Sequence, residues 1–304
     1  PFKFRNLALF LVSLVFYGWE KPIYLLIMLF VTVINYILGY LIESANENRK
    51  KRKQILIIGV ALNIAILCFF KYADFLISNL SQISLLSFLV PIGISLPIGI
   101  SFYIFQSMSY IIDVYRSNAG VQKSLIKFGT YVSMFPQLIA GPIVRYKDVC
   151  DELYNRKETF KQFGQGIYRL MIGVAKKVLV ANTMAKMCMV LSGMTEKTVL
   201  SYIVEALGYT LQIYFDFSGY SDMAIGLGRI FGFKFMENFN YPYISKSVTE
   251  FWRRWHISLG SWFRDYVYIP LGGNRVSKFK LLRNIFVVWF LTGFWHGANW
   301  TFIV

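Results

Sequence analysis

The stretch IYLLIMLFVTVINYILGYLI at residues 23–42 decides the class of fold. It contains no charged side chain, and it matches the roughly 20 apolar residues that a helix needs to cross the hydrocarbon core of a bilayer. A second apolar run, ILIIGVALNIAILCFF at residues 55–70, follows the basic cluster RKKRK at residues 49–53. These two runs predict membrane-spanning helices joined by a charged loop.

The whole chain has the composition of a membrane protein. Hydrophobic residues make up 56% of its 304 positions and charged residues 16%, against about 45–50% and about 25% in soluble domains. We therefore predict an all-α fold, a polytopic transmembrane helical bundle. The candidate spans lie at about residues 5–18, 22–42, 55–70, 90–113, 166–190, 200–217 and 285–304. Shorter apolar stretches at 75–90 and 128–141 predict interfacial or re-entrant helices.

The two ends of the sequence suggest a piece of a longer protein. The chain starts at Pro1 without an initiating Met and stops at Val304 inside an apolar run. We expect one domain over residues 1–304, truncated at both ends. Within it, residues 218–284 are rich in Tyr, Trp and Arg, which suit the head-group layer. This segment predicts an interfacial platform on the cytoplasmic side.

The formal charge of +16 is distributed between the apolar runs. Lys and Arg collect in alternate loops, which places those loops in the cytoplasm, where they meet anionic lipids of the bilayer. This pattern argues against nucleic acid as a partner. Cys68, Cys150 and Cys188 are too few and too far apart for a disulfide framework. With two histidines and no HExxH motif, no metal site is expected.

The repeated pattern PIGISLPIGIS at residues 91–101 interrupts an apolar stretch. Proline and glycine break the hydrogen-bond ladder of a helix, which a membrane protein tolerates only where other groups supply partners. Two interpretations stay open, a kinked entry to a helix or a break that lines a substrate site.

The segment FWHGANW at residues 294–300 holds the main candidate for chemistry, His296. An ionisable side chain inside an apolar span indicates a functional site. Burial disfavours the imidazolium, so we expect a neutral ring that accepts a proton. Helical spacing predicts Thr292, Asn299 and Trp300 on the same face, and Gly293 and Gly297 predict room for a neighbouring helix or a substrate chain. The alternative is a histidine that only joins two helices by a hydrogen bond.

A second histidine, His256, lies in EFWRRWH at residues 250–256. It either orients an acyl donor on the cytoplasmic side or is an interfacial residue without a reactive role. Asp216 and Asp222 close an apolar span, and we expect them to form ion pairs with Arg229 or with Arg253 and Arg254. The residues expected to support or line the site are Asn299, Trp295, Trp255, Arg253, Asp216, Asp222 and Arg145.

Six stretches together resemble the membrane-bound O-acyltransferase family, in the bacterial branch typified by the alginate O-acetylation membrane protein. They are FKYADF (70–75), LPIGISFYIFQSMSYIIDVYR (96–116), FPQLIAGPIVRY (135–146), YFDFSGYSDMAIGLGRIFGF (214–233), FWRRWHISLGSWFRDYVYIPLGGN (251–274) and FLTGFWHGANWTFI (290–303). The WRRWH and WHG blocks, some forty residues apart, are the most specific.

The resemblance implies an O-acyltransferase in the bacterial cytoplasmic (inner) membrane. Its invariant histidine falls on His296 and its second histidine on His256. The implied reaction moves an acyl group from a cytosolic thioester such as acetyl-CoA to a hydroxyl of an exported polysaccharide such as alginate. The implied partners are periplasmic acetylation proteins, and no tightly bound cofactor is implied. The YIPLGGN sequence favours polysaccharide acetylation over the teichoic-acid D-alanylation branch.

In the predicted reaction, His296 deprotonates the acceptor hydroxyl, and Asn299 or an indole N–H stabilises the oxyanion. Whether the acyl group passes through a covalent His296 intermediate stays open. Two other classes stay open: a transporter with a proton path through Asp216, Asp222 and His296, and a non-enzymatic scaffold for secreted acetylases.

Overall fold

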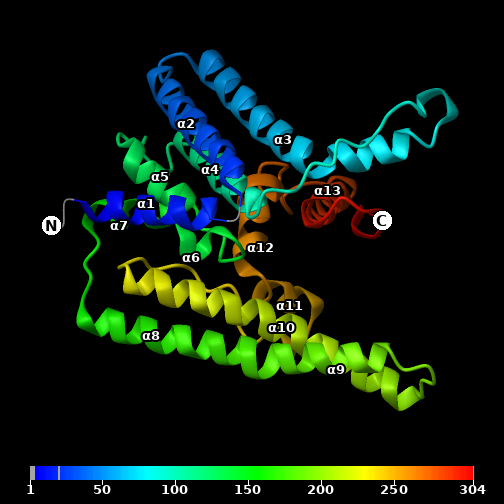
Figure 1. Cartoon of the computed structure of the whole chain (residues 1–304). Helices are drawn as coiled ribbons and strands as arrows, with labels where there is room; N and C mark the ends of the chain where they lie inside the picture. The colour runs from blue at the N-terminus through cyan, green and yellow to red at the C-terminus, as the bar shows by residue number, and fades with distance from the viewer. Residues whose placement is uncertain (1–3, 20, 304) are drawn as a thin grey trace. The chain divides into compact units, whose positions relative to one another are not determined.

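The computed structural model describes residues 4–19 and 21–303, and every regular element in these residues is a helix (Figure 1). The chain divides into two compact units. Unit 1 comprises Pro1–Leu138, Arg145–Lys147 and Ser261–Val304, and unit 2 comprises Ile139–Val144 and Asp148–Gly260. The all-α prediction is confirmed.

Unit 1 is built around two long helices that lie side by side (Figure 1). Its elements are α1 (Arg5–Gly18), α2 (Pro22–Ser44), α3 (Arg49–Leu80), η2 (Ser84–Leu86), α4 (Ile100–Tyr115), α5 (Leu125–Ser133), α6 (Phe135–Leu138), η5 (Arg264–Tyr268), α13 (Lys278–His296) and α14 (Trp300–Ile303). Helices α7 (Tyr146–Asn155) and α12 (Ile257–Phe263) each contribute residues to both units.

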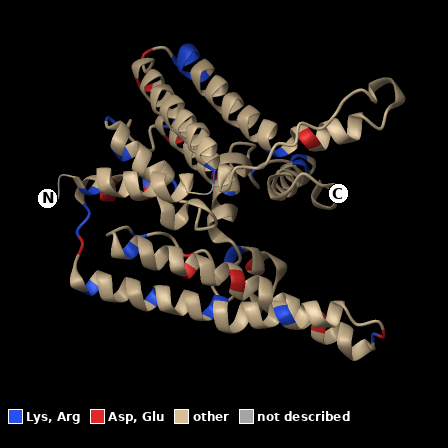
Figure 2. Ribbon diagram, viewed as in Figure 1, with Lys and Arg blue, Asp and Glu red and all other residues tan. Residues whose placement is uncertain are grey.

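Helices α2 and α3 are long and apolar enough to cross a membrane, and α1 is a shorter apolar helix. Figure 2 shows Lys and Arg gathered at the start of α3 and the middle of both helices free of charge. On the buried face, Asn35 and Asn63 exchange two side-chain hydrogen bonds of 3.0 and 2.8 Å. Such an amide pair joins two apolar helices where water is absent, and is worth about 0.6–2 kcal/mol.

Two predictions about the first half of the chain are wrong. Helix α3 continues to Leu80, so residues 75–90 do not form a separate interfacial helix. The predicted span 90–113 begins as a helix only at Ile100, after Gly99 with φ of 71°. Before that point, the Asp74 carboxylate accepts hydrogen bonds of 2.7 Å from the main-chain N–H groups of Ile92 and Ile94. A side chain of α3 thus satisfies backbone groups that the proline-interrupted segment leaves without helical partners.

Aromatic side chains form the core of unit 1. Tyr103, Tyr110, Phe128 and Tyr131 are fully buried. The ring of Tyr110 lies against Gly39 of α2, where a Cβ atom would come within 2.4 Å of its hydroxyl oxygen. The absence of a side chain at that glycine allows α4 to pack closely on α2.

Unit 2 is dominated by two long antiparallel helical segments (Figure 1). One segment runs without interruption through α8 (Phe160–Ala175), the π-helical turn η3 (Lys176–Ala181) and α9 (Asn182–Ser192). The other is α10 (Val199–Ile230), followed by η4 (Pro242–Ile244) and α11 (Val248–Arg254). Residues 218–230 belong to α10, and the predicted platform 218–284 contributes to both units; its place at a membrane surface stays a prediction.

Four glycines set the distance between α8 and α10. A Cβ atom at Gly173 would lie 2.5 Å from the carbonyl oxygen of Gly219, and one at Gly166 would lie 2.6 Å from that of Gly226. The glycines on each helix are seven residues apart, which places both pairs on one face. The two backbones are therefore in direct contact, an arrangement typical of helices packed within a membrane.

The predicted span 285–304 is not one helix. Helix α13 starts earlier, at Lys278, and ends at His296, because Gly297 is fully extended with φ of −169°. The chain then forms the short helix α14. This break places His296 at a helix end, whereas the sequence predicted it within a helix.

Candidate active site

The C-terminal end of α13 is held by two side chains of α3. The Lys71 ammonium donates to the carbonyl oxygen of Trp295, and the Tyr72 hydroxyl contacts the carbonyl oxygens of Phe294 and, at 3.0 Å, Gly297. The Tyr72 ring also stacks on Phe294 with 3.8 Å between ring centroids. Carbonyls in the last turn of a helix have no partner within the helix, so these contacts fix where α13 ends, immediately beside His296.

His296 lies at the surface of the part of the chain that the structure describes. Its ring lies 5.0 Å from Trp295 and 6.3 Å from Phe302, centroid to centroid. Phe302 occupies the space beside Gly293 and Gly297, where Cβ atoms would lie within 2.1 and 2.5 Å of it. The room predicted for a neighbouring helix or substrate is therefore filled by α14.

The predicted common face of His296, Asn299 and Trp300 is wrong, because the helix ends before the last two. The Asn299 Oδ1 atom accepts from the main-chain N–H of Thr301 at 3.1 Å, at the start of α14. The Trp300 indole donates to Oδ1 of Asn79 at 3.0 Å. Both residues still follow His296 within four positions, so they lie in the same segment as the imidazole.

An apolar cavity of about 200 Å³ lies next to this helix end. Lys71 and Tyr72 line it together with Cys68 and Trp295. The rest of its wall comes from α3, α4, α12, η5 and α13, through Val60, Ile64, Leu67, Phe105, Met108, Ile112, Trp262, Phe263, Tyr266, Val267, Leu291 and Phe294. A cavity of this composition suits an uncharged aliphatic group.

His256 lies in unit 2, between α11 and α12, and is 5% exposed. Its backbone adopts a left-handed conformation with φ of 44°. The ring packs edge-on against Phe217 at 4.7 Å, and its Nδ1 atom lies 3.1 Å from Oδ1 of Asn238. His256 is thus a buried, hydrogen-bonded imidazole, and its role and its place relative to the membrane stay predictions.

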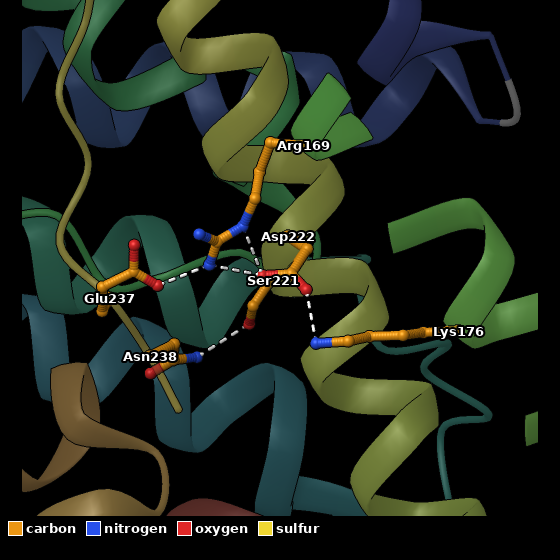
Figure 3. A network of polar contacts seen from close by, with 6 residues as sticks. All are labelled: Arg169, Lys176, Ser221, Asp222, Glu237 and Asn238. Atoms are coloured by element: carbon orange, nitrogen blue, oxygen red, sulfur yellow. Dashed lines mark hydrogen bonds and ion pairs between the residues drawn. The ribbon is translucent and has the colours of Figure 1, made fainter. Parts of the chain in front are cut away.

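Asn238 also belongs to a network of polar side chains in unit 2 (Figure 3). Asp222 pairs with Arg169 and Lys176, each at 2.6 Å, and Arg169 also pairs with Glu237 at 2.5 Å. Asn238 donates to the Ser221 hydroxyl at 3.0 Å. These residues border a cavity of about 640 Å³, whose aromatic wall includes Tyr214, Phe215, Phe239 and Tyr241.

The acidic residues form ion pairs, but with partners other than those predicted. Asp216 pairs with Lys177, so consecutive lysines in η3 reach two carboxylates of α10. Arg229 contacts Gln165 at 3.4 Å, and Arg254 pairs with Glu250 at 2.8 Å.

The remaining predicted residues lie in different surroundings. Trp255 belongs to an aromatic cluster with Phe239 and Phe251, whereas Arg253 is exposed at the end of α11. Arg145 pairs with Asp265 at 2.6 Å within unit 1. Burial acts to raise the pKa of Asp265, but the hydrogen bond from Arg264 and the charges of Arg145 and Lys147 outweigh it and hold that pKa below its ordinary value.

Sequence reasoning missed Lys71, Tyr72, Arg169, Lys176 and Asn238 as parts of these sites. Lys71 offered a signal, because a lysine within an apolar helix needs a polar partner. The others carried no such signal, since their partners are distant in the sequence. In the described ranges, no group of three or more His, Cys, Asp or Glu side chains could hold a metal ion.

The apolar helices α2 and α3, the backbone contact between α8 and α10 and the histidine at the end of α13 are the features expected of an all-helical membrane protein with an imidazole as its candidate reactive group. Residues 103–304 match MBOAT, the membrane-bound O-acyltransferase family, and the chain belongs to this family.

Two of three curated relatives match almost the whole chain, and the third matches about two thirds of it. A probable alginate O-acetylase AlgI of Pseudomonas aeruginosa is 49% identical over 99% of this chain and 59% of its own length. A peptidoglycan O-acetyltransferase of Helicobacter pylori is 37% identical over 99% of the chain and 62% of its length. A teichoic acid D-alanyltransferase of Bacillus subtilis is 32% identical over 68% of the chain and 55% of its length. The chain thus spans about three fifths of the length of these first relatives.

Proposed function

We propose that this protein is a membrane O-acyltransferase that acetylates a cell-surface polysaccharide, with His296 as the catalytic base. The observation that carries the proposal is the end of α13, where Lys71 and Tyr72 hold the segment that bears His296 beside an apolar cavity. A base must be held at a fixed place to take a proton in the transition state, and these contacts supply that restraint.

The reaction transfers one proton and one acyl group. His296 accepts the proton of the acceptor hydroxyl while the hydroxyl oxygen attacks the carbonyl carbon of the thioester. The carbon–sulfur bond then breaks, and the thiolate leaves and is protonated. The Asn299 amide N–H₂ and the Trp295 indole N–H are the donors proposed for the oxyanion.

The relatives support an acetyl donor and a polysaccharide acceptor. Identity is 49% to the alginate O-acetylase and 37% to the peptidoglycan O-acetyltransferase, against 32% to the D-alanyltransferase. We propose acetyl-CoA or another acyl thioester as the donor, and an exported polysaccharide such as alginate as the acceptor. Transfer of a D-alanyl group is the alternative that the donor assay below separates.

We further propose a multi-pass arrangement in the bacterial cytoplasmic membrane, as one domain with residues 218–284 on the cytoplasmic side and periplasmic acetylation proteins as partners. The family assignment and the apolar helices α2 and α3 support this placement. His256, buried in unit 2, is proposed to act on the donor. Asp216, Asp222 and Arg145 support the fold through their ion pairs, whereas Trp255 and Arg253 are proposed to line the approach of the donor.

The test compares His296→Ala with Phe286→Ala in the full-length protein. Phe286 is an exposed residue of the same helix, so its variant controls for an altered α13 surface. We expect His296→Ala to abolish polysaccharide acetylation and the turnover of radiolabelled acetyl-CoA in membranes, at unchanged protein level. Retained acetylation would refute the base, and turnover of a D-alanyl thioester alone would reassign the donor.

A further inference from the structure

The backbone around His256 is held on both sides by the segment that bears Asn238. The main-chain N–H of Ile257 donates to the carbonyl of Asn238 at 2.9 Å, and the main-chain N–H of Asn240 donates to the carbonyl of Arg254 at 2.9 Å. His256 lies between these two bonds in a left-handed conformation. Such a conformation is unfavourable for a non-glycine residue, and it persists only where neighbouring contacts enforce it.

The Asn238 side chain has only one orientation compatible with its neighbours. Its Oδ1 atom lies 3.2 Å from the main-chain nitrogen of Ser258 and 2.8 Å from the Ser258 hydroxyl. A main-chain N–H can only donate, so the atom facing it must be the carbonyl oxygen of the amide. The amide N–H₂ group then points to the Ser221 hydroxyl, which lies 3.0 Å from it (Figure 3).

This orientation determines the protonation of the imidazole. The Nδ1 atom of His256 lies 3.1 Å from the same Oδ1 oxygen. An unprotonated Nδ1 would set two lone pairs against each other, so Nδ1 must carry the hydrogen and donate it. In the neutral ring the lone pair is then on Nε2.

We propose that Asn238 is the positioning residue of His256, which it holds as the Nδ1–H tautomer so that Nε2 is the atom that accepts a hydrogen bond or a proton during acyl transfer. This inference rests on the proposed function for the role of His256, whereas the tautomer itself follows from the contacts alone. Ser221 extends the restraint to α10, one residue before Asp222 and its pairs with Arg169 and Lys176 (Figure 3).

The first experiment reads the tautomer directly. Full-length protein labelled with ¹⁵N-histidine is reconstituted in liposomes at pH 8, and its nitrogen spectrum is compared with that of His256→Gln to assign the signals. We expect Nδ1 of His256 to show a protonated, pyrrole-type shift and Nε2 an unprotonated, pyridine-type shift. The reverse pattern in the wild-type protein would overturn the proposal, whatever the activity.

The second experiment compares three variants. Asn238→Leu removes the acceptor at nearly constant volume, Asn238→Asp retains it, and Asn155→Leu makes the same change at an exposed asparagine of unit 2. We expect Asn238→Leu to lower kcat by about 10- to 100-fold with little change in KM, within the contribution of one proton-transfer group, and to mix the tautomer signals. Asn238→Asp should retain the Nδ1–H pattern and most of kcat, and Asn155→Leu should match the wild type.

The outcomes separate the two proposals. If His296→Ala abolishes transfer while Asn238→Leu folds and keeps full kcat, the positioning role is refuted and the proposed function stands. If His296→Ala keeps transfer while the wild-type spectrum shows Nδ1–H, the proposed function fails and the tautomer assignment stands. Thermal unfolding of each variant in detergent identifies a loss of fold, in which case the wild-type spectrum alone decides.

Discussion

Single side chains of α3 determine where distant backbone segments end or turn. Asp74 satisfies main-chain N–H groups of the irregular segment before α4, and Lys71 and Tyr72 cover carbonyls at the end of α13. All three lie within one turn of the same helix, where each replaces hydrogen bonds that the irregular backbone lacks. The candidate base His296 owes its position to neighbours more than two hundred residues earlier in the chain.

At the residue scale, Asp265 predicts a dependence of stability on pH. Its pKa lies below the ordinary value of 3.8 because its cationic neighbours outweigh burial. A carboxyl with a depressed pKa in the folded state stabilises the fold above its unfolded value, and the contribution is lost as the pH falls through the folded value. We expect wild type to unfold at a higher temperature than Asp265→Asn at pH 7, and this difference to shrink as the pH falls below 3.8 and Asp265 becomes protonated in the folded protein.

The measurement is thermal unfolding of the detergent-solubilised protein from pH 7 down to about pH 2, well below the ordinary pKa of an aspartate. Glu196→Gln, at an exposed position in the loop between α9 and α10, is the matched control and should follow the wild type. A gap between wild type and Asp265→Asn that is constant over this range would show that the carboxylate charge has no part in it.

At the scale of elements, the glycine contacts between α8 and α10 predict that glycine-to-alanine substitutions at two positions of α8 differ in their effect on the unfolding temperature. Gly173→Ala adds a Cβ atom 2.5 Å from a main-chain oxygen of α10, so the two helices must separate. Gly164→Ala adds one into open space and gains about 1 kcal/mol of helix propensity. We expect the first variant to lower the unfolding temperature and the second to leave it unchanged or raise it.

Thermal unfolding in one detergent, followed by helical circular dichroism, measures both variants. Equal effects of the two substitutions would mean that α8 and α10 are not in backbone contact in the folded protein.

The elements that the sequence predicted well are those decided by local composition. Residues 23–42 and 55–70 are apolar over their whole length, so the existence of α2 and α3 follows from the solvent that such surfaces require. The partner of Asp222 could not be predicted in the same way. Arg169 and Lys176 precede it by 53 and 46 residues, and only the packing of α8 on α10 brings them together.

The residues of the candidate site divide in the same way, into those that local sequence indicates and those that only tertiary packing brings together. His296 could be identified because an imidazole in an apolar run is costly and rare. Its neighbours could not, because helical spacing assumes that the helix continues, whereas Gly297 ends it. Asn238 was equally hidden, since its role depends on contacts with His256 and Ser258 across 18 and 20 residues.

At the scale of the whole molecule, loops rich in Lys and Arg alternate with loops poor in them, and this alternation predicts which loops face the cytoplasm. In full-length protein without Cys68, Cys150 and Cys188, we expect Glu196→Cys to react with a membrane-impermeant maleimide in intact spheroplasts. Asn46→Cys, next to the basic start of α3, should react only after permeabilisation. Both positions are exposed, so a lack of labelling would not result from burial of the introduced thiol. Labelling of both from the same side would contradict the proposed orientation.

The π-helical turn between α8 and α9 has a consequence for the geometry of the long segment. A wide turn holds about one residue more than an α-helical turn, which offsets the two flanking faces by roughly 100°. That angular offset keeps both halves facing α10, with Gly173 on one side of the turn and Cys188, beside Gly208, on the other. Deleting a single residue there would restore a regular rod and rotate one half away from its partner, so the length of this segment, as well as its composition, is constrained.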